Sequence, residues 1–224
     1  MKPALIIILL LLSNWLYSQK ELKAIYDSAY SIGLKNKNQG VHFFQENIPN
    51  INSRYISLPH YVLAQLHNKL GFSLDTVDLY YEKAHNYALS KNEDSLAFES
   101  IYDLAITYRR AGYQKIARAY YNKARQFAAE HELIILEGDA LNSIGIIHYR
   151  NYEYAEALTY YLKAKQIYLE SGNPAKIAKI YNNIGIIYKI FNHYDKAIEY
   201  YQKSIDIRKA NNIPARFNPY FNLN

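Results

Sequence analysis

The sequence predicts an all-α fold, an α-solenoid of stacked helical hairpins. Three observations support this prediction. Glycine and proline number only 8 and 6 among 224 residues, which argues against an all-β fold with many tight turns. Tyrosine is abundant, at 25 residues, and such overuse is typical of a slot that recurs in an internal repeat. Within that repeat, the apolar positions have the spacing of helix faces.

The first eighteen residues, MKPALIIILLLLSNWLYS, place Lys2 before an apolar run from Ala4 to Leu12. A charged start, an apolar core and a small residue at the end are typical of a secretory signal peptide. The run is well short of the ~20 residues that span a bilayer. We expect cleavage after Ser18, Gln19 as the new N-terminus, and export to a periplasm or out of the cell. An uncleaved membrane anchor is the alternative. The predicted cleavage site, a small residue followed by glutamine, resembles that of export signals of Bacteroidota.

A block of forty residues recurs in the remainder of the chain. It is marked by the strings YYEKA, YYNKA, YYLKA and YYQKS, which begin at Tyr80, Tyr120, Tyr160 and Tyr200. Other columns keep the same register and fall on helix faces at i, i+3, i+4 and i+7. The residues that we assign to the structural core of the repeat are Ala105, Tyr108, Ala117, Tyr121, Ala124, Gly145, Ala157, Tyr161, Ala164, Tyr181, Gly185, Tyr188, Ala197 and Tyr201.

Two of these columns hold small residues on different helices. A glycine inside a helix costs about 1 kcal/mol relative to alanine. The presence of Gly145 and Gly185 within predicted helices therefore needs a structural explanation. We expect them to face Ala157 and Ala197 on the partner helix. Small residues on both sides would let the two backbones approach closely while tyrosine rings fill the flanks.

The segment from Ile180 to Ile205, IYNNIGIIYKIFNHYDKAIEYYQKSI, resembles a tetratricopeptide repeat. Each repeat of that family is a hairpin of a helix A and a helix B. The period of forty resembles the longer variants of bacterial regulators and sensors, since the usual period is about 34. Armadillo and HEAT arrays share a period of about forty but lack the Tyr-Tyr and Gly pattern.

The signal-peptide pattern and the repeat resemblance together divide the chain into segments. These are a signal peptide, a helical cap or degenerate repeat, four repeats and the start of another. The first repeat is degenerate because Gln65 and Asn68 occupy its Gly and Tyr columns. The predicted boundaries are 1–18, 19–57, 58–97, 98–137, 138–177, 178–217 and 218–224.

The last segment, NPYFNLN, aligns Phe221 and Asn222 with the columns of Tyr181 and Asn182. Repeat arrays usually end in a polar capping helix. We therefore expect either a fragment of a longer protein, which we favour, or an end that a partner covers. The chain resembles the N-terminal sensor region of longer tetratricopeptide-repeat proteins, namely histidine kinases and LuxR-type regulators.

No pattern in the sequence indicates catalysis. The chain has no cysteine, and none of its 7 histidines has the spacing of a helical zinc site. Phosphate loops and nucleophile elbows are absent as motifs. We therefore expect no enzyme activity, metal or cofactor. The net charge is +6, but the lysines and arginines are scattered among acidic residues and do not form a basic patch. We therefore expect no nucleic-acid partner.

The resemblance implies that helix A of each repeat lines a concave surface that binds a protein or peptide. Its amides would bond a peptide backbone and its cations would favour an acidic partner. Ordinary solvation of these side chains is the alternative. We call the residues in the ligand-facing columns the predicted partner face: Tyr102, Arg109, Arg110, Asn142, Tyr149, Arg150, Asn182 and Lys189. The predicted function is a non-catalytic binding scaffold, with a sensor-domain fragment as the alternative; the oligomeric state is open.

Overall fold

The computed structural model describes residues 20–47 and 57–214, and within them every regular element is a helix. This confirms the predicted all-α fold of helical hairpins. The predicted signal peptide, its cleavage site and the segment 218–224 lie outside the described residues. None of the described helices combines the length and apolarity needed to cross a membrane.

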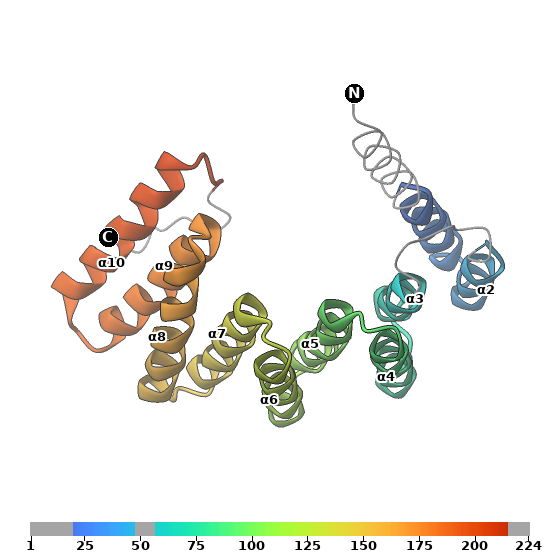
Figure 1. Ribbon diagram of the computed structural model, residues 1–224, viewed down its shortest axis with the longest axis horizontal. Coiled ribbons are helices and arrows are strands. Elements are labelled where there is room, and N and C mark those ends of the chain that lie inside the picture. The colour runs from blue at the N-terminus through green and yellow to red at the C-terminus, as the bar shows by residue number, and fades with distance from the viewer. Residues whose placement is uncertain (1–19, 48–56, 215–224) are drawn as a thin grey trace, which may run out of the picture. The chain divides into compact units, whose positions relative to one another are not determined.

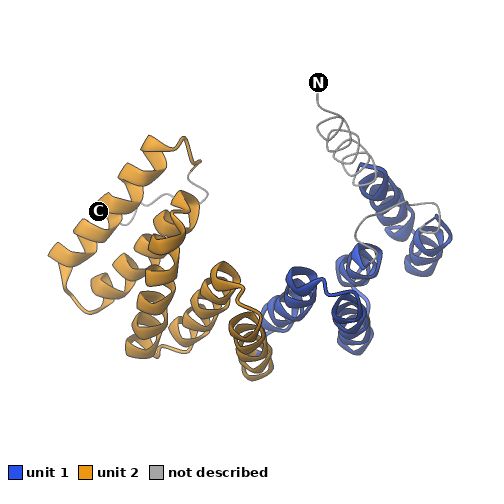
Figure 2. Cartoon of the chain, viewed as in Figure 1, with its two compact units in different colours: residues 1–113 blue, residues 114–224 orange. Residues whose placement is uncertain are grey.

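The chain forms two compact units, residues 1–113 and 114–224 (Figure 2). Unit 1 holds a first helix whose described part is 20–33, followed by four labelled helices (Figure 1). These are α2 (Lys37–Asn47), α3 (Leu58–Lys69), α4 (Leu74–Ser90) and α5 (Asp94–Arg110). Unit 2 holds α6 (Gln114–Glu130), α7 (Ile134–Arg150), α8 (Tyr154–Ser171), α9 (Pro174–Ile190) and α10 (Tyr194–Ala210).

Short turns with a left-handed residue give the backbone its period of forty. Positive φ angles occur at Gly112, Tyr152 and Asn192 after the A helices, and at Asn92, Glu132, Gly172 and Asn212 after the B helices. After most helices, the residue that follows the left-handed one donates its N–H to a carbonyl five residues back, as in His193 to Tyr188 at 2.9 Å. This is the Schellman closure of a helix end. Helices of 17 residues, as in α7 and α9, joined by such turns explain a period longer than the usual one.

In unit 2 the predicted core residues other than Tyr181 and Tyr188 are buried, and the glycines contact tyrosine rings. A Cβ built on Gly185 would lie 2.6 Å from Cε1 and 2.7 Å from Cδ1 of Tyr201, and Gly145 has the same relation to Tyr161. For Gly145 the carbonyl oxygen of Ala157 follows at 3.3 Å. The expected approach of the glycine to the alanine of the partner helix is therefore seen at Gly145 and Ala157, whereas the nearest atoms to Gly185 all belong to Tyr201. The glycines mainly make room for a flat ring that crosses the hairpin.

Two predicted core residues, Tyr181 and Tyr188, are only partly buried. The corresponding residues of α7, Leu141 and His148, are buried at 5% and 8% exposure. Tyr188 instead stacks on Tyr200, with ring centroids 5.5 Å apart. The hairpin of α9 and α10 is the last one described, so no described helix covers its outer side.

Ser204 stands where the other repeats have alanine, and it is completely buried. Its hydroxyl donates a hydrogen bond to the carbonyl oxygen of Ala178 on α9, at 2.6 Å. The buried hydroxyl is therefore satisfied, which explains why serine is tolerated in an alanine column.

In unit 1, the helix at 20–33 and α2 approach through their backbones. A Cβ on Gly40 would lie 2.5 Å from the carbonyl oxygen of Ala29 and 2.6 Å from Cα of Gly33. Leu22, Phe44 and Leu66 join one apolar core with these helices and α3. The predicted N-terminal segment 19–57 thus contains a helical hairpin that packs on the first repeat.

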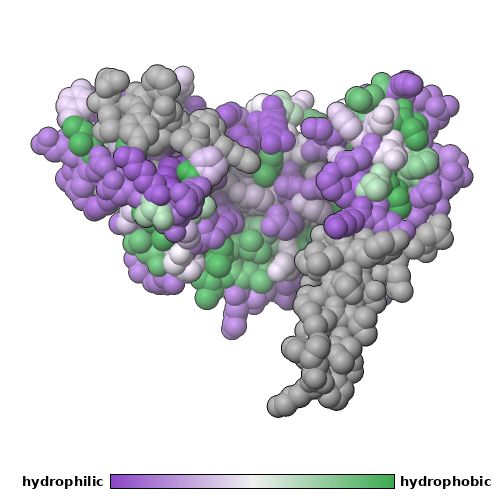
Figure 3. All heavy atoms as spheres, turned by 90° about the horizontal axis from the view of Figure 1, so that it is seen from above, coloured by the Kyte–Doolittle hydropathy of each residue, from purple (hydrophilic) through white to green (hydrophobic). Residues whose placement is uncertain are grey.

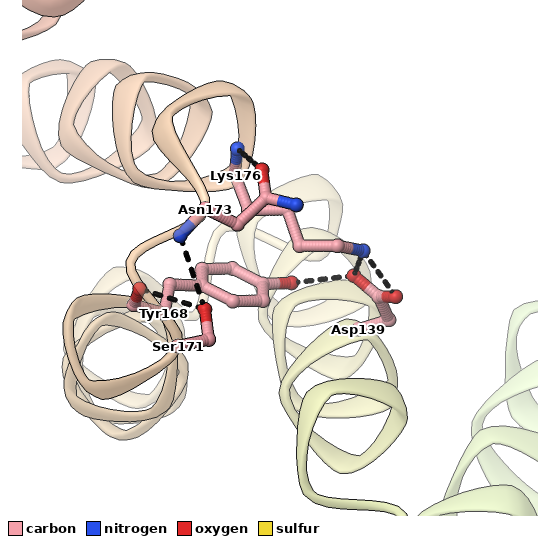
Figure 4. A network of polar contacts seen from close by, with 5 residues as sticks. All are labelled: Asp139, Tyr168, Ser171, Asn173 and Lys176. Atoms are coloured by element: carbon pink, nitrogen blue, oxygen red, sulfur yellow. Dashed lines mark hydrogen bonds and ion pairs between the residues drawn. The ribbon is translucent and has the colours of Figure 1, made fainter.

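A polar network joins α7, the end of α8 and the start of α9 (Figure 4). The hydroxyl of Tyr168 donates to Oδ1 of Asp139 at 2.8 Å, and the ammonium of Lys176 bonds the same oxygen at 2.6 Å. The ring of Tyr168 is buried at 1% exposure. It fits because Gly138 lacks a side chain: a Cβ there would lie 2.9 Å from Cε1 of Tyr168. The network fixes α9 against α7.

Exposed hydrophobic side chains occur in both units. Tyr152, Ile134 and Tyr194 are 79%, 58% and 57% exposed. In Figure 3 hydrophobic residues form patches within a largely hydrophilic surface. Large apolar residues exposed in this way are common on soluble proteins and do not by themselves indicate a site.

Candidate partner-binding site

In unit 2 the predicted partner face lies on the A helices α7 and α9. Arg150 is exposed, whereas Tyr149, Asn182 and Lys189 are partly exposed. These side chains come from two helices that lie side by side, as the contact between Asn142 of α7 and Asn183 of α9 shows. The face therefore offers amide, phenol and cationic groups from consecutive repeats.

Asn142 does not belong to the accessible part of this face. It is 2% exposed, and its Oδ1 accepts a hydrogen bond from Nδ2 of Asn183 at 2.9 Å. The assignment of Asn142 to the partner face is therefore corrected: its amide links two A helices. The reason is that the neighbouring helix brings Asn183 over it, which the column pattern of one helix does not reveal.

Tyr149 of α7 lies close enough to Tyr161 and to Tyr201 to affect the pKa of both phenols. Burial, and secondly the nearby Tyr149, raise the pKa of Tyr161 and raise the pKa of Tyr201 to about 12. The hydroxyl of Tyr201 is buried and makes no hydrogen bond with any described residue. A buried hydroxyl without a hydrogen bond costs about 1–3 kcal/mol.

In unit 1 the predicted partner face comprises three residues of α5. Tyr102 is partly buried, and its ring stacks on Phe98 with centroids 5.3 Å apart. Arg109 is partly exposed and Arg110 is exposed. Arg110 also lines a pocket, to which the other two do not contribute.

This pocket, which we call the unit 1 pocket, has a volume of about 490 Å³. Its lining combines residues from the first helix, α3, α4 and α5: Tyr26, Gln65, Asn68, Lys69, Tyr81, Asp103 and Arg110. Ligand pockets of proteins commonly have volumes of about 300–1,000 Å³. The volume is therefore sufficient for a small ligand or a few residues of a peptide.

Hydrogen bonds hold the polar wall of the unit 1 pocket in place. Oδ2 of Asp103 accepts from the hydroxyl of Tyr61 at 2.7 Å and from Nε2 of Gln65 at 3.3 Å. Nδ2 of Asn68 donates to Oγ1 of Thr107 at 2.8 Å. Burial, followed by the charge of Asp103, raises the pKa of Tyr61 and of Tyr81, so both phenols stay protonated as donors.

Sequence reasoning missed all the pocket residues except Arg110. Gln65 and Asn68 were noticed only as departures from the repeat pattern. Long polar side chains in the Gly and Tyr columns were nevertheless a usable signal, because a polar residue in a structural slot needs a polar environment. Tyr26 and Asp103 carried no such signal, since their meeting depends on how helices of different repeats pack.

The described residues contain no group of three or more His, Asp or Glu side chains placed to hold a metal ion. The polar groups of both candidate sites are instead amides, phenols, cations and single carboxylates. Groups of these types form hydrogen bonds and ion pairs with peptides and proteins.

The hairpins and their ring-on-glycine contacts define a helical repeat fold of the tetratricopeptide type. Residues 136–210 match the family model described as tetratricopeptide repeat. No curated protein sequence matches the chain.

Several solved structures share the fold. BtubC from P. vanneervenii has a TM-score of 0.62 and 15% identity, with 87% of this chain and 92% of that chain covered. Aspartyl phosphate phosphatase F from Bacillus subtilis has a TM-score of 0.68 and 16% identity, with coverage of 89% and 50%. The Rap conjugation gene regulator of plasmid pLS20, in complex with the Phr* peptide, has a TM-score of 0.61 and 16% identity, with coverage of 82% and 52%. The chain thus spans about half the length of the last two proteins. At these identities the likeness shows the fold alone.

Proposed function

We propose that this chain is a non-catalytic scaffold that binds a protein or peptide along the A helices of its repeats. The observation that carries the proposal is the contrast within unit 2. Most structural positions of α7 and α9 are buried in packing, whereas Tyr149 and Lys189 are partly exposed and Arg150 is exposed. A peptide supplies backbone carbonyl and carboxylate oxygens that can accept hydrogen bonds from these phenol and cationic donors.

The charge of each candidate surface indicates the character of the partner. Arg150 and Lys189 are cationic in unit 2, and Arg109 and Arg110 are cationic in unit 1. Arginine binds carboxylates in a two-pronged geometry. An acidic peptide or protein segment is therefore the partner that fits best. The peptide complex of the pLS20 regulator shows that this general fold can hold a peptide, which supports the proposal by analogy.

The proposal predicts that an Arg109→Ala/Arg150→Ala variant loses most of its partner binding. The immobilised chain would be used to capture a partner, and the affinity of that partner would then be measured for both proteins. We expect a loss of about tenfold or more, because truncated arginines are frequent hot spots of interfaces. A matched control is Lys123→Ala/Lys163→Ala, which removes two exposed cations from the B helices α6 and α8. Equal binding by all three proteins would move the site away from the A helices.

We also propose that the protein is exported, on the basis of the charged start and apolar run in residues 1–18. Mass spectrometry of the protein recovered from its native host should find a mature chain that begins at Gln19. An intact Met1 on the exported protein would contradict cleavage and would favour the retained anchor.

A further inference from the structure

We infer that the unit 1 pocket binds a short peptide segment of about three residues through its opposite charges. A positively charged group of the ligand lies at Asp103, and a carboxylate lies between Lys69 and Arg110. This inference rests on the proposed function, since it specifies which part of a peptide partner the pocket takes.

Asp103 forms the acidic end of the pocket. Both hydrogen bonds that Asp103 accepts go to Oδ2, from Tyr61 and Gln65. Oδ1 accepts none from a described residue and is not among the buried atoms without a partner. A carboxylate has about four acceptor positions on its two oxygens. Oδ1 can therefore accept from an ammonium group that enters the pocket.

Lys69 and Arg110 form the basic end of the pocket. Lys69 and Arg110 line the pocket and are both exposed. The hydrogen bonds from Gln65 to Asp103 and from Asn68 to Thr107 show that α3 and α5 run in the same direction. Lys69 follows Asn68 directly and therefore lies toward the Arg110 end. Lys69 and Arg110 therefore both belong to the end of the pocket opposite Asp103, where the ammonium of Lys69 lies over the ring of Tyr30, 5.8 Å from its centroid.

The distance between the two ends sets the length of the ligand. Arg110 lies seven positions after Asp103 on α5. This spacing places the two residues on one face of the helix, about 10 Å apart along its axis. An extended peptide spans at most about 3.3–3.6 Å per residue, so about three residues reach from one end to the other. Between the ends, the amide of Asn68 donates to Thr107 and to Tyr81, which leaves the carbonyl oxygen of Asn68 and the O–H of Tyr81 for the peptide backbone.

The charges also exclude other ligand classes. A polyphosphate or a dicarboxylate would place negative charge against Asp103. A polyamine would place positive charge against Lys69 and Arg110. A ligand with one charge of each sign, separated by two or three peptide units, satisfies both ends.

The test uses trialanine as the probe, with free termini, with an acetylated amine, and with an amidated carboxylate. Each probe is titrated into the full chain while backbone amide NMR shifts are followed. We expect the free tripeptide to shift amides around the pocket and to bind about tenfold more tightly than either blocked form. Charge-assisted hydrogen bonds are worth about that factor. The comparison of the three probes on the unmodified protein needs no variant and therefore does not depend on variant folding.

Two variants assign the charges to residues. Asp103→Asn should abolish the preference for the free amine, and Arg110→Gln should abolish the preference for the free carboxylate. Lys91→Gln is the matched control, because Lys91 is an exposed cation of unit 1 that does not line the pocket. Absence of binding, or equal binding of all three probes, would overturn the inference. That outcome leaves the capture experiment with Arg109→Ala/Arg150→Ala unaffected, so failure of the pocket and failure of the proposed function can be told apart.

Discussion

A Gly185→Leu substitution is expected to lower the free energy of unfolding by about 1–3 kcal/mol, the range for overpacked cores. The new Cβ would lie within 2.7 Å of two ring carbons of Tyr201, and that ring is buried at 1% exposure between the two helices. Leucine gains about 1 kcal/mol of helix propensity over glycine, so a net loss must come from the collision. Urea unfolding followed by circular dichroism measures the change, and hydrogen exchange of α9 and α10 locates it.

Two further variants separate the collision from a general effect of leucine. Ala175→Leu adds a leucine to an exposed position of the same helix and should change stability by less than ~0.5 kcal/mol. Tyr201→Ala placed in the Gly185→Leu background should cost much less than the sum of the two single changes, because the leucine fills the space of the ring. A Gly185→Leu protein as stable as the unmodified one would show that Gly185 has no packing role.

The second large effect is expected at Tyr168. Tyr168→Ala should lower the free energy of unfolding by about 3–5 kcal/mol, since it leaves a cavity where a buried ring stood. It also removes the hydrogen bond to Asp139. Tyr168→Phe is the matched control and should lose only the contribution of that bond, about 1 kcal/mol. Both values come from urea unfolding curves.

A pair of compensating substitutions at Gly138 and Tyr168 tests the same packing contact. Gly138 and Tyr168 correspond to Phe98 and Ala128 in the preceding repeat, where the large and the small residue have exchanged columns. Gly138→Phe alone should destabilise the fold, because its Cβ would lie 2.9 Å from Cε1 of Tyr168. Gly138→Phe combined with Tyr168→Ala should recover most of the loss. If the double variant were as unstable as the sum of the single variants, the two columns would not share one volume.

The sequence predicted which segments are helical better than it predicted the residue at which each helix begins. The helices α5 and α7 begin at Asp94 and Ile134, four residues before the predicted repeat boundaries at 98 and 138. Their N-cap residues, Glu93 and Leu133, make no side-chain capping bond. The sequence therefore carried no local signal for these starts. At α9 the signal existed, because Asn173 caps the helix and Pro174 follows it.

The sequence by itself determined the period of forty, the two helices of each hairpin and the columns that face inward. These features are local: they follow from helical spacing along one segment and from turns that recur at a fixed interval. Tertiary structure alone decided that Gly185 faces the ring of Tyr201, that Asn142 is covered by Asn183, and that Asp103 meets Gln65. Each of these depends on how one helix lies across another, and the spacing of residues along a single helix does not contain that information.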